Sequence, residues 1–518
     1  MERSRTKNSI INSTTSIVNQ VLTVLMDFAV KTIFIKILGS EYLGINGLFS
    51  NIITLLSLAD LGIGIAIPYS LYKPLAKKDT EKIKSLMKYY SKVYSVIGLV
   101  VLIIGLSITP FLPLIIKNMP DIPHIYLIYM MFATHSALSY LFVYKRFLIE
   151  SDQKGYIVSK ITFTCSFLLN VVRVIILILT KDFVLYLGCS IVFVLIQNIW
   201  YSKTADKMYP YLKDKDVKDV DKKELAEINK NIKSLFIYKI GNVIANGTDN
   251  IIISKFIGLI TVGLYSNYLL IINSLNNVVS QIFNAITSSI GNLVATNNER
   301  SKNIYEKLNF FNFYIFSLCA LCLFILINPF IYLWIGSDYM LSNWISALLA
   351  LNFYTAGMQS VTNSFRTAYG LFYIAKFRPI VMVVLNIIIS IILVKPLGVA
   401  GVVIGTILSR IFTTAWLDPY VVYKYGFKDS PKKYYIRYIY YLLIFVVSCI
   451  LIRLITNYIV AKNIIMWIVL AGITFILYNL IIILLFHRTE EFKYFYNKIK
   501  DLLNKIIKKI YNHKKLRF

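Results

Sequence analysis

The chain has 518 residues, of which 57% are apolar and 14% aromatic, and it carries a formal net charge of +29. Such a composition exceeds the apolar surface that a soluble domain can bury, and it excludes an ordinary soluble protein. In a soluble protein this charge would suggest nucleic acid, but here it lies in loops that would face anionic lipid, so no nucleic-acid partner is expected.

Fourteen apolar stretches are long enough to cross a bilayer, and positive charge alternates with them. The expected spans are 10–36, 43–72, 88–116, 123–146, 156–180, 183–207, 233–257, 262–294, 306–331, 340–366, 377–394, 398–423, 434–456 and 464–487. About 45 of the 55 Lys and Arg residues fall in every second gap, starting with the first. Because Lys and Arg collect in cytoplasmic loops, we expect a multi-pass protein of a bacterial cytoplasmic membrane with both termini in the cytoplasm.

The longest charged stretch divides the chain into two halves with similar sequence features. The matched pairs are Lys36 and Lys255, Gly39 and Gly258, Gly44 and Gly263, Arg146 and Arg366, and Asn170 and Asn386, at offsets of 216 to 220 residues. Six spans separate the copies, so both copies would enter the membrane from the same side as parallel repeats with a site between them near the midplane.

We therefore expect an all-α polytopic membrane protein with about fourteen transmembrane helices. Two parallel six-helix lobes would surround a central cavity, and a terminal helix pair would pack on the flank. The expected divisions are an N-lobe (1–208), a charged cytoplasmic linker (209–232), a C-lobe (233–425), the terminal pair (426–487) and a basic amphipathic cytoplasmic tail (488–518).

Four of the expected spans carry polar side chains along one helical face. They are Asn12, Ser16, Gln20, Thr23, Asp27 and Lys31 in the first, Asn46, Ser50, Ser57 and Asp60 in the second, Asn242, Asn246, Asp249 and Asn250 in the seventh, and Asn273, Asn277, Gln281, Asn284, Ser288 and Asn292 in the eighth. Unpaired polar groups cannot face lipid tails. They either join packed helices or line a hydrated cavity, and their extent along the helices favours the cavity.

Charged side chains inside the spans are the sharper candidates for function. Arg173 and Arg410 have no opposite charge within one turn of their own helices. Each therefore needs a carboxylate from another helix, water or an anionic ligand. Asp60 and Asp249 are the obvious carboxylates, and pairing with them would make these charges structural.

The sequence shows no catalytic signature. Cys319 and Cys322 form a C-x-x-C pair, but they lie one turn apart in an apolar run, where Cys behaves as a small hydrophobe. The four histidines are scattered, and no phosphate-binding glycine loop or nucleophile–base pair is visible. We expect neither an enzyme nor a metal or other cofactor.

The second span and the loop after it resemble the bacterial polysaccharide flippase family, which includes the flippases of capsular and O-antigen repeat units. The similarity lies in Ser57–Gly64, in Lys73–Asp79 and in the opening run Asn12–Ser40, and it extends over essentially the whole chain. The family belongs to the multidrug, oligosaccharidyl-lipid and polysaccharide exporter superfamily. The resemblance implies a cavity lined by spans one, two, seven and eight, and transport of undecaprenyl-diphosphate-linked oligosaccharide from the inner to the outer leaflet by alternating access.

This resemblance assigns expected roles to the polar and charged residues. Candidates for binding the diphosphate are Lys31, Arg173 and Arg410 within the spans and Arg146 and Arg366 at the inner mouth, although topology alone would also explain the last two. Candidates for lining the cavity and binding sugar are Asn12, Ser16, Gln20, Thr23, Asn46, Ser50, Asn242, Asn246, Asn273, Asn277, Gln281 and Asn284.

The energy source stays open. Asp27, Asp60 and Asp249 are candidates for coupling to H⁺ or Na⁺, while an ion pair with Lys31 inside one helix is the alternative for Asp27. The membrane potential would also favour outward movement of a negatively charged headgroup.

Other functions and partners follow from the same features. A lipid II flippase or a cation-coupled multidrug exporter shares the architecture, though an exporter of cations would favour an acidic cavity. A membrane glycosyltransferase or polymerase is disfavoured because every expected outer loop is short. We expect lipid-linked oligosaccharide, anionic membrane lipid and polysaccharide polymerase or assembly machinery as partners, and a monomer, because two lobes already supply both halves of the cavity.

Overall fold

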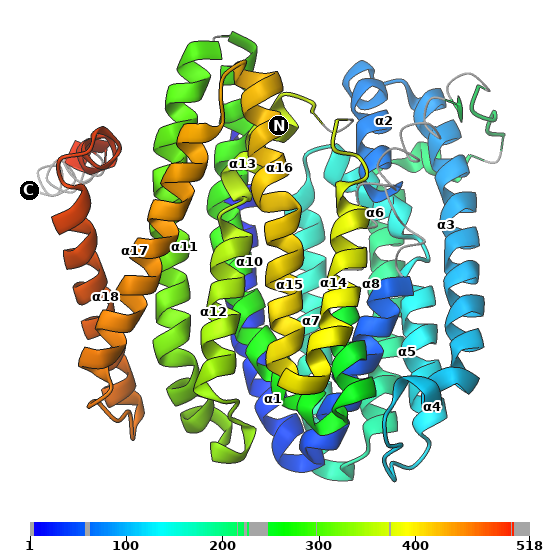
Figure 1. Cartoon of the computed structure of the whole chain (residues 1–518). Helices are drawn as coiled ribbons and strands as arrows, with labels where there is room; N and C mark the ends of the chain where they lie inside the picture. Colours follow the sequence, from blue (N-terminus) through cyan, green and yellow to red (C-terminus); the bar gives the residue numbers. More distant parts are fainter. Residues whose placement is uncertain are drawn as a thin grey trace, which may run out of the picture. The chain divides into compact units, whose positions relative to one another are not determined.

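The computed structural model describes residues 5–56, 63–214, 216–221, 225–226, 247–296, 298–371, 374–498 and 500–501. Every regular element within these ranges is a helix (Figure 1). The chain falls into two compact units: unit 1 comprises Met1–Asn267 and Ser390–Val402, and unit 2 comprises Tyr268–Ile389 and Val403–Phe518.

Unit 1 contains the first eight α-helices and the beginning of the second half of the chain. Its helices are α1 (Arg5–Leu56), α2 (Ile63–Lys77), α3 (Thr80–Ile108), α4 (Leu112–Ile115), α5 (Ile125–Ser139), α6 (Val143–Ser151), α7 (Gly155–Thr180) and α8 (Phe183–Met208), with the short helices Thr109–Phe111 and Pro210–Lys213. Residues 247–256 are helical, and α10 (Leu259–Thr296) starts in this unit.

Unit 2 contains most of α10 and the helices that follow it. They are α11 (Asn298–Ile335), the short helix Ser337–Tyr339, α12 (Asn343–Gly357), α13 (Ser360–Ala368), α14 (Arg378–Leu397), α15 (Val399–Phe412), α16 (Thr414–Val421), the π-helical turn Val422–Phe427, α17 (Lys432–Thr456) and α18 (Ile464–Phe486). The ends of α14 and α15 that face each other, Ser390–Val402, belong to unit 1.

The prediction of an all-α polytopic membrane protein is confirmed. Among the described residues, eight helices are long and apolar enough to cross a bilayer, or nine if the pair α5 and α6, bent by 43°, is one span. The long helices α1 and α10 are not among these eight, and they are the helices that carry the polar stripes of the first and eighth spans. The seventh expected span, 233–257, is described only from residue 247.

Polar side chains cap several helices at the points where the apolar runs begin. Asp182 accepts hydrogen bonds from the backbone N–H groups of Val184 and Leu185 at the start of α8. At the start of α18, the Asn463 side chain accepts a hydrogen bond from the backbone N–H group of Met466 at 2.9 Å. A cap of this kind satisfies backbone donors that a helix leaves open.

The internal repeat is visible in the backbone of unit 1. The matched glycines Gly39 and Gly258 both have positive φ values, +84° and +140°, and both interrupt a helical path. Residues with a side chain rarely adopt such φ values, whereas glycine does so without a steric cost. The two copies therefore break at the same position of the repeat.

Five residues after each break, the two copies pack against each other without room for a side chain. A Cβ atom on Gly44 would clash with the carbonyl oxygen of Leu259. A Cβ atom on Gly263 would lie 2.7 Å from the carbonyl oxygen of Ser40. At the repeat offset of 219 residues, Ser40 corresponds to Leu259 and Gly44 to Gly263, so the two contacts are exchanged by the repeat. A local pseudo-two-fold axis thus passes through this helix crossing.

In unit 2, α17 and α18 form a hairpin beside α11 (Figure 1). Much of its outer surface is apolar and exposed, including Leu454, Ile465 and Leu484 at 62%, 68% and 73%. Exposure of large apolar side chains on this scale is tolerated where lipid replaces water.

The first residues of the basic tail pack on unit 2. Glu491 pairs with Arg437 at 3.0 Å, and the ring of Phe495 stacks on that of Phe311 with centroids 5.0 Å apart. The amphipathic pattern of the tail therefore has a protein partner in its described part, up to residue 501. The rest of the tail lies outside the described residues.

Candidate functional site

In unit 1, charged side chains of α1 and α7 form one cluster. Asp27 on α1 accepts a hydrogen bond from the Asn170 side chain and lies within electrostatic reach of Arg173 and Lys31. The Nζ atom of Lys31 donates to the backbone carbonyl of Ser266 at 3.0 Å. This bond joins α1 to α10 three residues beyond Gly263, next to the glycine crossing.

Arg173 extends this cluster to α8. Its Nη2 atom donates to Ser190 Oγ at 2.6 Å, and its guanidinium lies over the Tyr186 ring, 4.5 Å from the centroid. Its Nε atom is buried and makes no hydrogen bond. The cluster thus sets two cations, Lys31 and Arg173, against the single carboxylate of Asp27, and one cation retains an unused donor.

In unit 2, Arg410 of α15 donates hydrogen bonds to two residues of α12. Its Nη1 atom donates to the side-chain oxygen of Asn352 at 2.7 Å, to the backbone oxygen of Asn352 at 3.1 Å and to Thr355 Oγ1 at 2.9 Å. The side chain is half-buried on α15. These bonds from one amide residue and one hydroxyl residue of α12 orient the guanidinium, a group that can bind anions through its N–H donors.

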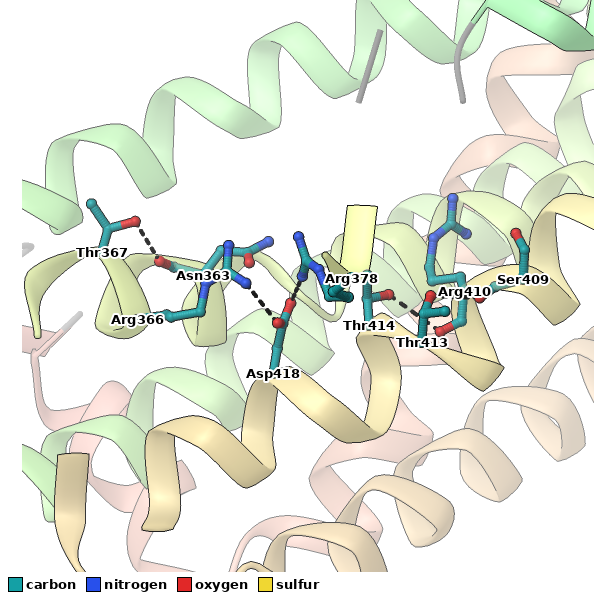
Figure 2. Close-up of polar contacts among 9 residues, drawn as sticks. All are labelled: Asn363, Arg366, Thr367, Arg378, Ser409, Arg410, Thr413, Thr414 and Asp418. Carbon is teal, nitrogen blue, oxygen red and sulfur yellow. Dashed lines mark hydrogen bonds and ion pairs between the residues drawn. The ribbon is translucent and has the colours of Figure 1, made fainter. Parts of the chain in front are cut away.

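A second group of charges in unit 2 is fully buried (Figure 2). Asp418 on α16 pairs with Arg366 on α13 at 2.7 Å and also with Arg378 at the start of α14. The three side chains are 0%, 2% and 5% exposed, respectively. Charges buried to this extent require partners, so the triad fastens three helices together.

Arg366 is therefore already occupied in this structure, and a ligand would reach it only if the triad opened. Its repeat partner Arg146 differs, because Arg146 is 39% exposed and pairs with Glu150 of its own helix at 2.9 Å. Sequence reasoning missed Asp418 and Arg378. The signal for Asp418 was present, because this carboxylate lies inside the expected span 398–423.

The remaining carboxylate candidates are only partly described. Asp249 accepts a hydrogen bond from the buried Tyr265 hydroxyl of α10, within unit 1. Asp60 lies outside the described residues. Arg173 donates to Ser190, and Arg410 donates to Asn352 and Thr355.

The described members of the polar stripes are mostly accessible. Ser50, Asn273, Asn277 and Gln281 are exposed, whereas Thr23 and Asn46 are half-buried. The side chains of the other sugar-binding candidates lie outside the described part of the structure: Asn12, Ser16, Gln20, Asn242, Asn246 and Asn284. Exposure along α10 is the property expected of a face that meets water or substrate rather than of one that joins packed helices.

No group of three or more side chains suited to hold a metal ion occurs among the residues that the structure describes. The polar groups of the two clusters and of the α10 stripe are mainly cations, amides and hydroxyls. Such groups can bind an anion and a polyhydroxylated group.

No protein-family model and no curated protein sequence matches this chain. Solved structures do match it. The lipid II flippase MurJ in an inward closed conformation aligns with a TM-score of 0.65 at 14% identity, covering 92% of this chain and 99% of that one. An inward-facing multidrug resistance MATE family transporter of the MOP superfamily aligns with a TM-score of 0.60 at 16% identity, covering 78% and 96%.

A mutant of the MATE transporter VcmN from Vibrio cholerae aligns less closely, with a TM-score of 0.52 at 14% identity over 80% of this chain and 97% of that one. At identities this low, the matches show the fold alone. The chain has the all-helical fold found in MATE and MurJ structures.

Proposed function

We propose that this chain is a transporter of the MOP superfamily that flips a lipid with a diphosphate and a sugar headgroup across a bacterial cytoplasmic membrane. The substrate would be undecaprenyl-diphosphate-linked oligosaccharide, moving from the inner to the outer leaflet for a surface polysaccharide. The fold supports the coarser part of this proposal, because its structural neighbours are a lipid II flippase and MATE transporters.

The observation that carries the finer part is the environment of the cations inside the spans. Arg173 and Lys31 both lie within electrostatic reach of the Asp27 carboxylate, and the Nε atom of Arg173 is buried without a hydrogen bond. Burying cations without full compensation is costly in a membrane. A diphosphate would supply additional negative charge, and Arg can bind it through two parallel hydrogen bonds.

The exposed amides of α10 suit the sugar part of the headgroup. Asn273, Asn277 and Gln281 each offer both donors and acceptors, which match hydroxyl groups that also donate and accept. A polar face of this kind would carry a headgroup past the hydrocarbon while the lipid tail stays in the bilayer.

Two sources of energy are compatible with these residues. Asp27, with its neighbours Asn170, Lys31 and Arg173, and Asp249 are described carboxylates that could exchange H⁺ or Na⁺ during transport. The membrane potential acts independently of it, favouring outward movement of two negative charges by ~4–5 kcal/mol per 100 mV.

Transport of lipid II is the second candidate, favoured by the match to MurJ over 92% of this chain. A multidrug exporter is the third, since MATE structures share the fold. The charges inside the spans are of both signs, whereas an exporter of cations would favour an acidic cavity.

The test is transport in proteoliposomes with three probes in parallel: a fluorescent undecaprenyl-diphosphate oligosaccharide, lipid II and a cationic dye. The proposal predicts that the labelled oligosaccharide headgroup reaches the opposite leaflet faster than in protein-free vesicles, while the dye gradient is unaffected. Selective movement of lipid II would establish the second candidate. Dye export against an H⁺ or Na⁺ gradient with no lipid movement would contradict a flippase.

A further inference from the structure

A non-helical segment lies across the first turns of α3 in unit 1. It comprises residues 214 and 216–221, follows α8 and the short helix Pro210–Lys213, and is termed the acidic strap. Asp214 pairs with Lys84 at 3.0 Å, and Asp219 pairs with Lys88 at 3.0 Å. Lys88 also donates to the backbone carbonyl of Val217 at 2.8 Å.

Beneath the strap is a pocket of about 370 Å³ lined by four lysines. Lys84, Lys88 and Lys92 come from α3, and Lys145 comes from α6. Positions spaced by four residues share one face of a helix, so the three α3 lysines project together. Like charges placed this closely repel each other, so anions between them stabilise the arrangement.

Without the strap, the positive charge of the four lysines is only partly compensated. Lys84 is 8% exposed and also pairs with Glu81, while Lys145 pairs with Asp206 at 2.7 Å. Two carboxylates outside the strap therefore face four lysines. The strap supplies two more, Asp214 and Asp219, and its departure would leave an excess of two positive charges.

The electrostatic effect is already visible on the strap. The hydrogen bond and the charge of Lys88 hold the pKa of the Asp219 carboxyl below its ordinary value, and the charge of Lys92 makes a smaller contribution. The carboxylate is thus stabilised as an anion by the lysines of the pocket. A stronger anion would be stabilised by the same groups.

We propose that this pocket is a binding site for a phosphate-bearing anion, and that the Asp214 and Asp219 carboxylates of the acidic strap compete with this anion for the lysines. The lysine ammonium groups would bind phosphate oxygens, and the hydroxyl groups of Ser91 and Tyr144, which also line the pocket, can donate to them. Binding of the anion and seating of the strap would exclude each other.

The alternation of positive charge along the chain puts the start of α3 on the cytoplasmic side, where two sources of phosphate meet. One is the headgroup of an anionic phospholipid, and the other is a phosphate or diphosphate compound in solution. The residues that line the pocket do not include Lys31, Arg173 or Arg410, so its existence does not depend on the transported substrate.

The experiment measures binding to the purified full-length protein with two probes. Inorganic pyrophosphate is titrated in a neutral detergent, and phosphatidylglycerol retained from nanodiscs is compared with phosphatidylcholine by native mass spectrometry. The double substitution Asp214→Asn with Asp219→Asn frees the pocket, and we expect it to tighten binding roughly threefold to tenfold. Lys88→Gln with Lys92→Gln is expected to weaken binding at least tenfold.

The matched control is Lys203→Gln with Lys207→Gln, which removes two lysines one turn apart at the end of α8, outside the pocket. We expect binding to change less than twofold. Thermal unfolding followed by intrinsic fluorescence checks that each variant folds. If the variant with both Lys88→Gln and Lys92→Gln does not fold, the single substitution Lys92→Gln replaces it in the binding measurement.

Binding of pyrophosphate supports a soluble ligand, and selective retention of phosphatidylglycerol alone supports a lipid headgroup. In either case, hydrogen exchange in residues 216–221 should rise when the ligand is added, because the strap is displaced. The proposal is overturned if the strap variant binds neither probe more tightly than the wild type. It is equally overturned if the control weakens binding as much as the pocket variant, because diffuse surface charge would then be the cause.

Discussion

At the scale of single residues, arginines inside this protein fall into two kinds that differ in their partners. Arg366 and Arg378 share the carboxylate of Asp418 and are sealed from solvent. Arg410 donates to an amide oxygen and a hydroxyl of α12. We expect the first kind to maintain the fold, and for the second the binding of a ligand stays a prediction.

Asp418→Asn should be strongly destabilising, because it leaves two buried guanidinium groups around a neutral amide. Breaking a buried charge network by removing one partner costs ~3–5 kcal/mol. Chemical unfolding in detergent would measure the loss. Asp338→Asn is the control, since Asp338 is exposed in the helix Ser337–Tyr339 and should cost less than about 0.5 kcal/mol. A loss below about 1 kcal/mol for Asp418→Asn would contradict a structural role for the triad.

Spacing and hydropathy identified Lys31, Arg173 and Arg410 as charges inside spans, but they did not identify how each charge is compensated. The partner of Arg366 lies 52 residues further along the chain. Such a pair depends on how α13 and α16 pack, and no local sequence pattern predicts it. The roles of all five cationic candidates stay predictions.

At the scale of helices, the repeat predicts where substitution is least tolerated. Gly44→Ala places a methyl group against the backbone of Leu259, which cannot move away as a flexible side chain would. We expect a loss of ~1–3 kcal/mol, the typical cost of overpacking. Gly472→Ala on α18 is the control, because nothing lies within 4 Å of the added atom. Equal unfolding free energies for the two variants would show that the crossing is not close-packed.

The tail gives a second prediction at this scale. Phe495→Ala removes the ring that stacks on Phe311, so the segment 490–498 should detach from α11. Hydrogen exchange in that segment should then increase several-fold. Tyr496→Ala is the comparison, since this ring is 59% exposed and contacts Phe492 of the tail itself. Unchanged exchange in the Phe495 variant would mean that other contacts hold the tail.

Hydropathy predicted the positions of most helices well, because a span must contain about 20 apolar residues whatever its neighbours are. It did not predict the breaks. The expected span 340–366 is divided into α12 and α13, and 398–423 into α15, α16 and a π-helical turn. At the first of these, Gly357 lies tightly against the Phe316 ring of α11. Breaks of this kind arise from packing between helices, which periodicity does not reveal.

At the scale of the whole molecule, the sequence predicted the class of protein because alternating charge and fourteen apolar stretches involve the entire chain. The resemblance to polysaccharide flippases, by contrast, points to a substrate that low-identity structural matches do not specify. MATE and MurJ structures share one fold. Substrate choice depends on side chains, and those must be tested by transport.

Charge movement offers a test of the transport direction. If a headgroup with two negative charges crosses outward, a potential that is negative on the starting side should favour transfer by ~4–5 kcal/mol per 100 mV. A potassium gradient with valinomycin imposes such a potential on proteoliposomes. We expect the labelled headgroup to accumulate in the leaflet on the positive side. Indifference of the final distribution to the potential would indicate that transfer is electroneutral through coupling to a cation.

The most direct measurement is the initial rate of headgroup transfer for Arg410→Gln in the same proteoliposomes. Glutamine keeps a polar side chain but carries no charge, so we expect the rate to fall at least tenfold. Arg453→Gln is the matched control, because Arg453 lies over the Phe324 ring near the end of α17. Its rate should stay within twofold of the wild type. Equal rates for wild type and both variants would contradict a cation inside the membrane that recognises the diphosphate.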